Sequence, residues 1–202
     1  TAYKSGSGYT GTMTNMNLNL SVDSGKLGQA LNFNGTSSYV DMGNSASLAV
    51  SFPYTIAAWV KAANFDTWAT LVTTDINPGF TSGANLQIQG STGYPQIGFG
   101  NNGGSNEKAG PSPIALNTWQ HLVGVVRGPG DMDLYVNGVD VGGSYSGAEV
   151  TIQYTGNNAR MGDDSLGNDF FEGSLDDVRV YNRALTPAEV KQLYGLGGAT
   201  IR

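Results

Sequence analysis

Residues 119–127, with the sequence Trp-Gln-His-Leu-Val-Gly-Val-Val-Arg, carry the strongest strand signal in the chain. Apolar and β-branched residues dominate this stretch, which is typical of a strand inside a sheet. The turn residues Gly128-Pro129-Gly130 follow, and then Met132–Val136, the pair Asn137-Gly138 and Val139–Val141. Asn-Gly between β-forming residues is the strongest short-range signal for a β-hairpin. The region therefore predicts a long strand followed by a tight hairpin.

Upstream segments show the same strand character. Residues 54–61 are apolar on both faces, which predicts a central strand buried on two sides. Ala30–Asn34 and Tyr39–Met42 flank a polar turn at 35–38 and predict a second hairpin. Residues 101–113 are rich in Gly, Asn and Pro and predict a long loop. Further strands are expected at residues 68–74, 86–89, 96–99, 151–154, 159–161 and 175–181.

One helix is expected, near the C-terminus. Thr186 is placed to be its N-cap and Pro187 its first residue, and Glu189 completes a capping box. Gly195 is expected to end the helix. About a dozen short strands and one short C-terminal helix predict an all-β protein, a two-sheet antiparallel jelly-roll sandwich. No internal repeat or linker divides the chain, so residues 1–202 are expected to form one domain.

Composition excludes several classes of function. The 202 residues include 30 Gly and no Cys, so a disulfide framework, a Cys-ligated zinc site and a Cys nucleophile are excluded. Lys and Arg total 10 against 16 Asp and Glu, a net charge of −6. This acidic balance, without a basic run, argues against nucleic acid or an anionic membrane surface as partner. No apolar stretch is long enough to insert across a bilayer.

Several segments together resemble the LamG-like family of laminin-G, pentraxin and concanavalin A-like jelly-roll domains. The segments occur in the order of the family's motifs and span most of residues 10–195: Gly25–Gly35, Tyr39–Gly43, Tyr54–Lys61, Trp119–Val123, Leu134–Gly138 and Gly173–Glu189. The resemblance implies a concanavalin A-like curved sandwich and an extracellular or cell-surface ligand-binding domain. It implies a glycan or polysaccharide as the commonest partner, a protein surface as another, and calcium as a frequent ion.

Two groups of oxygen-bearing residues are candidates for such ligands, since calcium binds six to eight oxygens. By resemblance Asp176 lies near the turn at Asn34, which makes Asn34 and Asp176 the metal candidates. The family pattern has an Asp and an Asn before Gly11, where this chain has no carboxylate. The second group is the acidic loop with Asp163, Asp164, Asn168 and Asp169, for which a solvated turn is the alternative.

Aromatic faces and amides are the groups that bind sugars in a neutral groove. Trp68 and Tyr94 stand in polar loops and are the candidate platforms, with Asn101 and Asn102 beside them as hydrogen-bonding groups. Asp163, Asp164, Asn168 and Asp169 complete the predicted ligand site. Trp59 and Trp119 lie in strong strand patterns and are expected in the core.

Catalytic machinery is not evident in the sequence. His121 is the only His and lies in an apolar strand, which favours a structural role. The chain lacks a Gly-x-Ser-x-Gly elbow, and its four Glu are too far apart to form the Glu-x-Asp-x-x-Glu arrangement of jelly-roll glucanases. We therefore expect a non-catalytic, exported carbohydrate-binding domain. The alternatives are a structural or adhesion domain that contacts protein, and a jelly-roll glycosidase or polysaccharide lyase.

Overall fold

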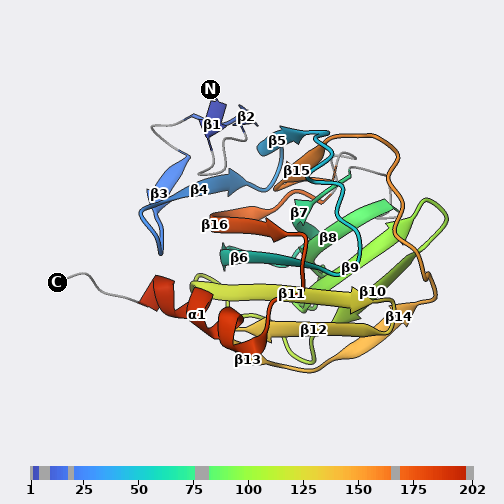
Figure 1. The fold of residues 1–202 in the computed structure, drawn as a ribbon. Coiled ribbons are helices and arrows are strands. Elements are labelled where there is room, and N and C mark those ends of the chain that lie inside the picture. Colours follow the sequence, from blue (N-terminus) through green and yellow to red (C-terminus); the bar gives the residue numbers. More distant parts are fainter. Residues whose placement is uncertain (1, 5–9, 18–20, 76–81, 165–168, 199–202) are drawn as a thin grey trace.

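The computed structural model describes residues 2–4, 10–17, 21–75, 82–164 and 169–198. Two antiparallel sheets face each other, which confirms the predicted sandwich (Figure 1). The nine-stranded sheet has the order β1 (Ala2–Lys4), β2 (Thr10–Thr14), β5 (Tyr39–Gly43), β15 (Ala159–Met161), β7 (Ala69–Thr73), β8 (Ser82–Ile88), β9 (Pro95–Asn101), β10 (Ser105–Ala109) and β14 (Ser144–Gly147). The seven-stranded sheet has the order β13 (Val139–Asp140), β12 (Asp131–Val136), β11 (Gln120–Gly128), β6 (Tyr54–Ala62), β16 (Glu172–Tyr181), β4 (Gln29–Asn34) and β3 (Val22–Ser24).

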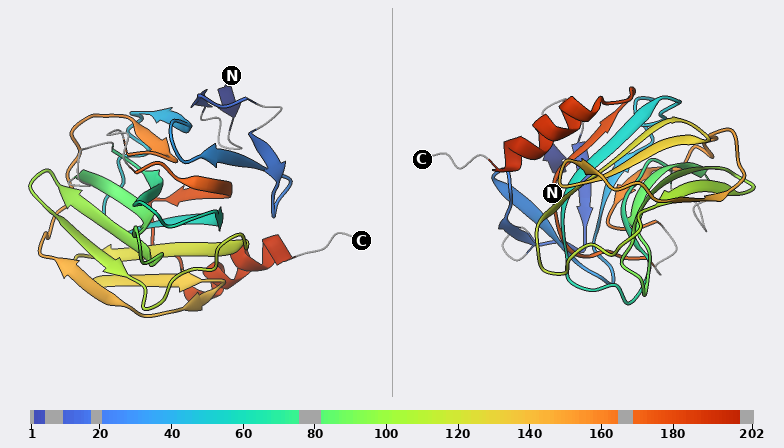
Figure 2. Two further views of the ribbon diagram at one scale, coloured as in Figure 1. Left: turned by 180° about the vertical axis from the view of Figure 1, so that it is seen from behind. Right: turned by 90° about the horizontal axis from the view of Figure 1, so that it is seen from below.

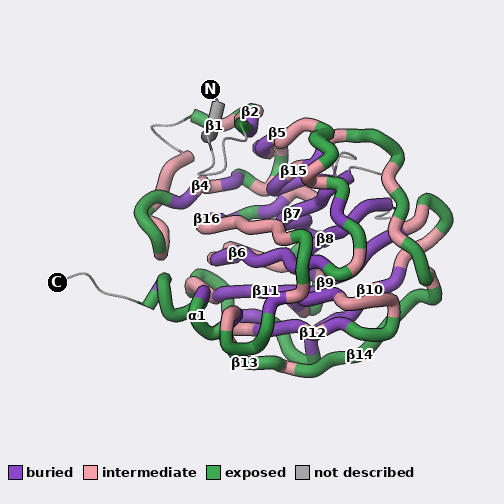
Figure 3. Tube along the Cα trace, in the orientation of Figure 1, coloured by how far each residue is buried: buried purple, intermediate pink, exposed green. Residues whose placement is uncertain are grey.

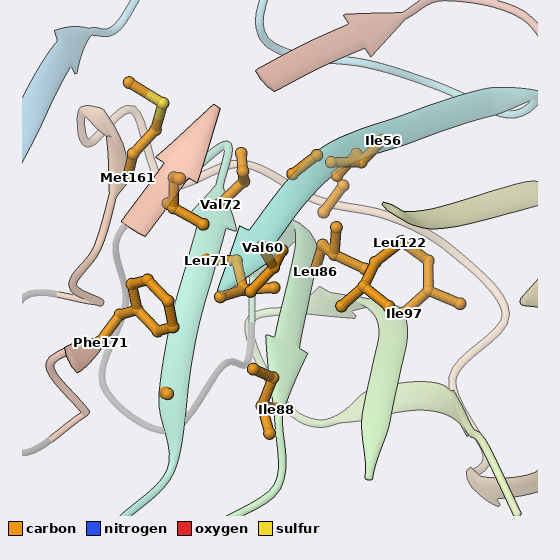
Figure 4. Close-up of a cluster of buried hydrophobic side chains, with 14 of the residues drawn as sticks. Ile56, Val60, Leu71, Val72, Leu86, Ile88, Ile97, Leu122, Met161 and Phe171 are labelled. Carbon is orange, nitrogen blue, oxygen red and sulfur yellow. The ribbon is translucent and has the colours of Figure 1, made fainter. Parts of the chain in front are cut away.

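The main hydrophobic core fills the space between the two sheets (Figure 4). Strand alternation places every second side chain of a strand on the inner face. Ile56, Val60 and Leu122 contribute from the seven-stranded sheet. Leu71, Leu86 and Ile97 contribute from the nine-stranded sheet, and all six are fully buried. The core therefore holds the sheets together and leaves each sheet with an outer face.

The two strongest predicted elements are present. β6 lies between β11 and β16, so the predicted central strand is confirmed. β12 and β13 form the hairpin at Asn137-Gly138, where both residues have positive φ, 53° and 77°. A type I′ turn requires this backbone conformation, and Asn followed by Gly adopts it at little cost.

The predicted hairpin of residues 30–42 is wrong. β4 pairs with β3 and β16 in one sheet, whereas β5 pairs with β2 and β15 in the other. The turn between them crosses the sandwich instead of joining neighbours. Asn34 Oδ1 holds this crossing by accepting hydrogen bonds from the backbone N–H groups of Thr36, Ser37 and Ser38, at 2.9–3.0 Å. Alternation located both strands correctly, but it carries no information about which strand each one pairs with.

Helix α1 (Pro187–Gly198) lies on the outer face of the seven-stranded sheet (Figure 2). The capping box is confirmed, since Thr186 N donates to Glu189 Oε2 at 2.8 Å and Glu189 N donates to Thr186 Oγ1 at 3.3 Å. The expected end at Gly195 is wrong, because the helix continues for three residues. At Gly197 an added Cβ would lie 2.4 Å from the Trp59 ring, so this glycine lets the last turn pack directly on Trp59.

The stretch 101–113 is not a continuous loop, because it contains β10. Asn106 and Lys108 of β10 are buried although both are polar, which hid the strand from a hydrophobicity pattern. Trp59 is buried as expected, but Trp119 is only half-buried at the start of β11. The burial pattern of Figure 3 shows buried strand centres and exposed connections.

Candidate functional site

The outer face of the nine-stranded sheet carries a row of uncharged polar side chains. In β8, Ala84, Leu86 and Ile88 point into the core, so Asn85 and Gln87 point to the opposite face. Gln87 pairs with Thr70 of β7 on one side and with Gln96 of β9 on the other. We call Thr70, Asn85, Gln87 and Gln96 the polar floor. Each is no more than 2% exposed.

The polar floor is short of hydrogen-bond partners within the part of the chain that the structure describes. Thr70 Oγ1, both polar atoms of Asn85 and Gln87 Oε1 are buried and have no partner there. Gln96 differs, because its Oε1 accepts a hydrogen bond from Gln89 Nε2. A buried polar atom that loses its hydrogen bonds to water without replacement costs about 1–3 kcal/mol. Such groups are rare in folded proteins, and each calls for an explanation such as an ordered water, an ion or a ligand.

An acidic cluster, Asp163, Asp164 and Asp169, adjoins the polar floor. Thr70 N donates to Asp169 O at 3.1 Å, which fixes the cluster against β7. Asp163 and Asp164 are 2% and 1% exposed. Burial, the Asp164 carboxylate with its hydrogen bond, and the Asp163 charge together raise the pKa of Asp169 to about 7.

One cation, Arg160, joins the acidic cluster. Its Nη1 donates to Asp163 Oδ2 at 2.7 Å, and its Nε lies 3.9 Å from Asp41 Oδ2. Its guanidinium carbon also lies 4.0 Å from the centroid of the Tyr39 ring. The guanidinium is therefore already engaged by two carboxylates and an aromatic face.

Trp68 and Tyr94 lie at the same end of the sheet as the acidic cluster. Trp68 directly precedes β7, whose first residue pairs with Ile88, and Ile88 pairs with Pro95. Tyr94 thus lies at the same end of the sheet but two strands from the start of β7, and its carbonyl accepts from Gln89 N at 2.9 Å. β15 runs antiparallel to β7, so the chain beyond Met161 continues towards Trp68. Trp68 is 38% exposed and can offer a ring face to a ligand.

The structure therefore brings four predicted ligand residues, Trp68, Asp163, Asp164 and Asp169, to one end of β7, and Tyr94 lies at the same end of the sheet but two strands away. Asn168 lies outside the described residues. Asn101 and Asn102 stand at the other end of β9, about 20 Å from Tyr94 for a strand of this length. Asn101 Oδ1 accepts hydrogen bonds from Gly103 N and Gly104 N, so it stabilises a turn.

The metal candidates Asn34 and Asp176 do not converge. Asn34 pairs with Glu172, four positions before Asp176 on β16, which corresponds to about 13 Å along the strand. Asp176 Oδ2 accepts from Leu27 N and Oδ1 from Asp177 N, both at 2.7 Å, while Asn34 Oδ1 serves its turn. The two side chains do not fit a shared calcium ion. In the described residues no group of three acidic, His or Cys side chains could hold a metal ion. Calcium stays a prediction from the resemblance alone.

His121 lies far from the polar floor, on the outer face of the seven-stranded sheet. Its ring centroid is 5.1 Å from that of Trp59 and 6.3 Å from that of Tyr194. Burial and the charge of Arg179 lower the pKa of His121 to about 4, so the ring is neutral at physiological pH. This setting agrees with a structural role.

The sequence analysis missed Thr70, Asn85 and Gln87 as site residues. The signal that could have found them is the alternation Ala-Asn-Leu-Gln-Ile at 84–88, which puts two amides on one face of a strand. Amide side chains in a strand ordinarily face solvent. Only the strand register shows that Asn85 and Gln87 lie with Thr70 beside the acidic cluster.

Among the described residues, no helix is long and apolar enough to cross a bilayer. A search of the curated proteins finds no match.

Solved structures share this fold. Domain 4 of AbnA, an extracellular arabinanase from Geobacillus stearothermophilus in complex with arabinotriose, is 25% identical, with 92% of this chain and 88% of that chain covered and a TM-score of 0.70. The CBM40 of the Ruminococcus gnavus IT-sialidase, bound to α2,3 sialyllactose, is 17% identical, covers 82% of this chain and 96% of that chain, and has a TM-score of 0.64. The botulinum neurotoxin serotype G binding domain is 16% identical, covers 95% of this chain and 47% of that chain, and has a TM-score of 0.70. At the identities of the last two, the likeness shows the fold alone.

A family profile described as the concanavalin A-like lectin/glucanases superfamily (Laminin_G_3) matches residues 34–191. This match covers well over half of the chain and includes every strand from β5 to β16, among them the central strands β6 and β11. The chain therefore belongs to the concanavalin A-like lectin/glucanase superfamily.

Proposed function

We propose that this chain is a non-catalytic carbohydrate-binding domain of an exported protein, and that it binds a glycan on the outer face of the nine-stranded sheet. The observation that carries the proposal is the polar floor. Within the described residues, Thr70, Asn85 and Gln87 keep buried polar atoms that no protein group satisfies. A ligand rich in hydroxyl groups can satisfy both the donors and the acceptors of such a surface.

The position of Trp68 supports a sugar in particular. A pyranose or furanose ring has an apolar C–H face that stacks on an aromatic ring while its hydroxyl groups bond to amides and carboxylates. Trp68 is exposed at the end of the polar floor, and the acidic cluster provides carboxylate acceptors beside it. The 25% identical arabinanase domain, whose complex holds arabinotriose, supports the same class of ligand and an extracellular location.

Calorimetry with a panel of oligosaccharides, arabinotriose included, tests the proposal. Asn85→Ala removes a donor and an acceptor, and each lost hydrogen bond is worth about 1 kcal/mol, so we expect about tenfold weaker binding or more. Gln87→Ala should lose several-fold. Trp68→Ala should lose about threefold to tenfold through the missing ring contact.

Two control variants separate this site from other surfaces. Gln192→Ala removes an exposed amide of α1, on the outer face of the other sheet, and should leave affinity unchanged. Asn102→Gly keeps the left-handed backbone of residue 102, at φ 69°, and removes the side chain at the far end of β9. If Asn102→Gly weakens binding and Asn85→Ala does not, the site assignment is wrong. If no glycan of the panel binds, the carbohydrate-binding function is wrong.

Glycoside hydrolysis is the second candidate, and the raised pKa of Asp169 favours it, because a general acid must keep its proton near neutral pH. Glycosidases, however, hold their two carboxyl groups about 5–9.5 Å apart, on either side of the scissile bond. Asp164 and Asp169 instead interact through a direct hydrogen bond. We expect no release of reducing sugar from any bound polysaccharide. Turnover that disappears in Asp169→Asn would establish the hydrolase instead.

A further inference from the structure

The geometry points to a charge preference: we infer that the site takes uncharged glycans and rejects glycans that carry carboxylate groups. The inference deepens the proposed function and rests on it. It depends on two independent features that meet at β7, the acidic cluster and the polar floor.

The acidic cluster gives this end of the site a negative charge. Asp163 and Asp164 are almost fully buried, and Asp169 adjoins them. Arg160 offsets one of these charges through its 2.7 Å ion pair with Asp163. Asp41, 3.9 Å from the same guanidinium, adds a further negative charge. Partial burial weakens solvent screening, so this charge acts over several ångströms.

The groups that ordinarily bind a sugar carboxylate are engaged elsewhere. Carboxylates are recognised best by a guanidinium that donates two parallel hydrogen bonds. At this site the guanidinium is that of Arg160, whose Nη1 donates to Asp163 and whose face packs on Tyr39. A ligand carboxylate would have to compete with Asp163 for the Arg160 guanidinium. The negative charge of the neighbouring Asp164 would repel the ligand carboxylate there.

The polar floor suits a neutral ligand. Its side chains are a hydroxyl and three amides, and no described residue satisfies Thr70 Oγ1, Gln87 Oε1 or either polar atom of Asn85. Sugar hydroxyl groups donate and accept, so they can match a mixed set of donors and acceptors. A carboxylate only accepts, so it could accept from the Thr70 hydroxyl but would leave the carbonyl oxygens of Asn85 and Gln87 to depend on other parts of the ligand.

Calorimetry with matched pairs of ligands tests the inference on the intact chain. The probes are xylotriose with and without a glucuronic acid branch, and lactose with and without a terminal sialic acid, with arabinotriose as an added neutral ligand. Each pair differs by a sugar that carries one carboxylate. For every pair in which the neutral ligand binds, we expect the acidic counterpart to bind at least about tenfold more weakly, which corresponds to one like-charge contact near a partly buried carboxylate.

Variants then assign the preference to the cluster. At pH 8, above the raised pKa of Asp169, Asp164→Asn with Asp169→Asn removes two charges while keeping the shape of the side chains, and it should narrow the difference within a pair to less than about threefold. Asp140→Asn is the matched control, because Asp140 is exposed on β13 of the other sheet, and its Oδ1 bond to Gly142 N can be kept by Asn. This control should leave the tenfold difference intact. If the double variant does not fold, two other tests replace it. One is the single variant Asp169→Asn, and the other is added salt; each should raise the affinity for the acidic ligand alone.

The outcomes separate the inference from the proposed function. Equal or tighter binding of the acidic ligands overturns the inference, while a loss of binding in Asn85→Ala would still support a glycan site on the polar floor. A preference for neutral ligands that the cluster variants leave unchanged also overturns it, because another group then sets the preference. If neither member of any pair binds and arabinotriose does not bind, the proposed function fails and the inference fails with it.

Discussion

The outer faces of the two sheets carry different kinds of side chain. On the seven-stranded sheet, Ala57, Val123 and Val125 are covered by Val190 and Leu193 of α1. On the nine-stranded sheet, the corresponding positions of β7 and β8 hold a hydroxyl and amides with buried polar atoms that no described residue satisfies. One face is closed by the chain's own helix, whereas the other keeps its hydrogen-bonding capacity.

Polar residues on the seven-stranded face have partners beside the helix. Lys61 Nζ lies 3.3 Å from Asp23 Oδ2, which also accepts from Ser174 Oγ at 3.2 Å. Ser174 Oγ in turn accepts from Asn32 Nδ2. Trp59 Nε1 and His121 Nδ1 lack a hydrogen-bond partner in the described structure, but the Trp59 ring stacks on Tyr194 and the His121 ring lies tilted beside it. The contrast agrees with a first face that contributes stability and with the proposed ligand site on the second face.

The largest effect is expected where the helix closes its face. Trp59→Ala removes a ring that is 2% exposed and that stacks on Tyr194, with a centroid distance of 5.5 Å. Loss of a buried Trp side chain costs about 3–5 kcal/mol of the free energy of unfolding. Trp119→Ala, at a half-buried position, should cost clearly less. Urea denaturation followed by circular dichroism measures both, and equal losses would contradict the role given to Trp59.

The next effect concerns the contact between the helix and that ring. In Gly197→Ala the new Cβ would lie 2.4 Å from Trp59 Cζ2, so the last turn must shift, at about 1–3 kcal/mol. At Gly195 no described atom lies within 4 Å of the new Cβ, and Ala there should stabilise the helix by about 0.5–1 kcal/mol. Thermal unfolding of the two variants should therefore shift in opposite directions. A stabilising Gly197→Ala would show that the helix does not pack closely on Trp59.

Much of the fold could be predicted because its signals are local. Asn137-Gly138 and the Thr186–Glu189 capping box each need only neighbouring residues to form, and both are present. The pairing of β4 and β5 could not be predicted in the same way. A turn held by Asn34 looks the same in sequence whether the chain returns along its neighbour or crosses to the other sheet.

The candidate site was predictable only in part, for the same reason. Exposed-looking residues such as Trp68 and the acidic cluster stand in turns and are visible in the sequence. Thr70 precedes Asn85 and Gln87 by 15 and 17 positions in the chain. Only the register of β7 and β8 brings it beside these two amides. Asn101 carried the same amide signal as Asn85, but it caps a turn at the other end of β9.

A pH-dependent effect is expected at the edge of the polar floor. The pKa of Asp169 is raised to about 7, so the folded protein holds this proton between pH 4 and 7 while the unfolded chain has released it. The resulting stabilisation is fully present below about pH 4 and is lost as the pH rises through 7. Because Asp169 is only partly buried, solvent screening reduces the size of this stabilisation to about 1–2 kcal/mol.

Asp169→Asn isolates this contribution, because Asn resembles the protonated carboxyl group. Relative to the variant, the wild-type chain should lose stability between pH 4 and pH 7 and show no further loss at higher pH. The pKa of Glu189, lowered to about 2 by Arg183 and Thr186, lies outside this window, so that carboxylate stays charged throughout. Urea midpoints at several pH values measure the difference between the two proteins. A difference that does not change with pH would show that Asp169 is ionised in the folded protein across this range.

The smallest effect compares one amide from each face. Asn85→Leu replaces a buried side chain whose donors and acceptors no described residue satisfies, so stability should stay the same or rise by about 1 kcal/mol while glycan binding is lost. Asn32→Leu removes the amide that donates to Ser174 Oγ on the other sheet, and it should lower stability by about 1 kcal/mol without affecting binding. If the first face is built for folding and the second for a ligand, Asn32→Leu must lower stability while Asn85→Leu leaves it unchanged or raises it. If Asn85→Leu destabilises the protein as much as Asn32→Leu does, Asn85 is a structural residue, and the distinction between the two faces does not hold.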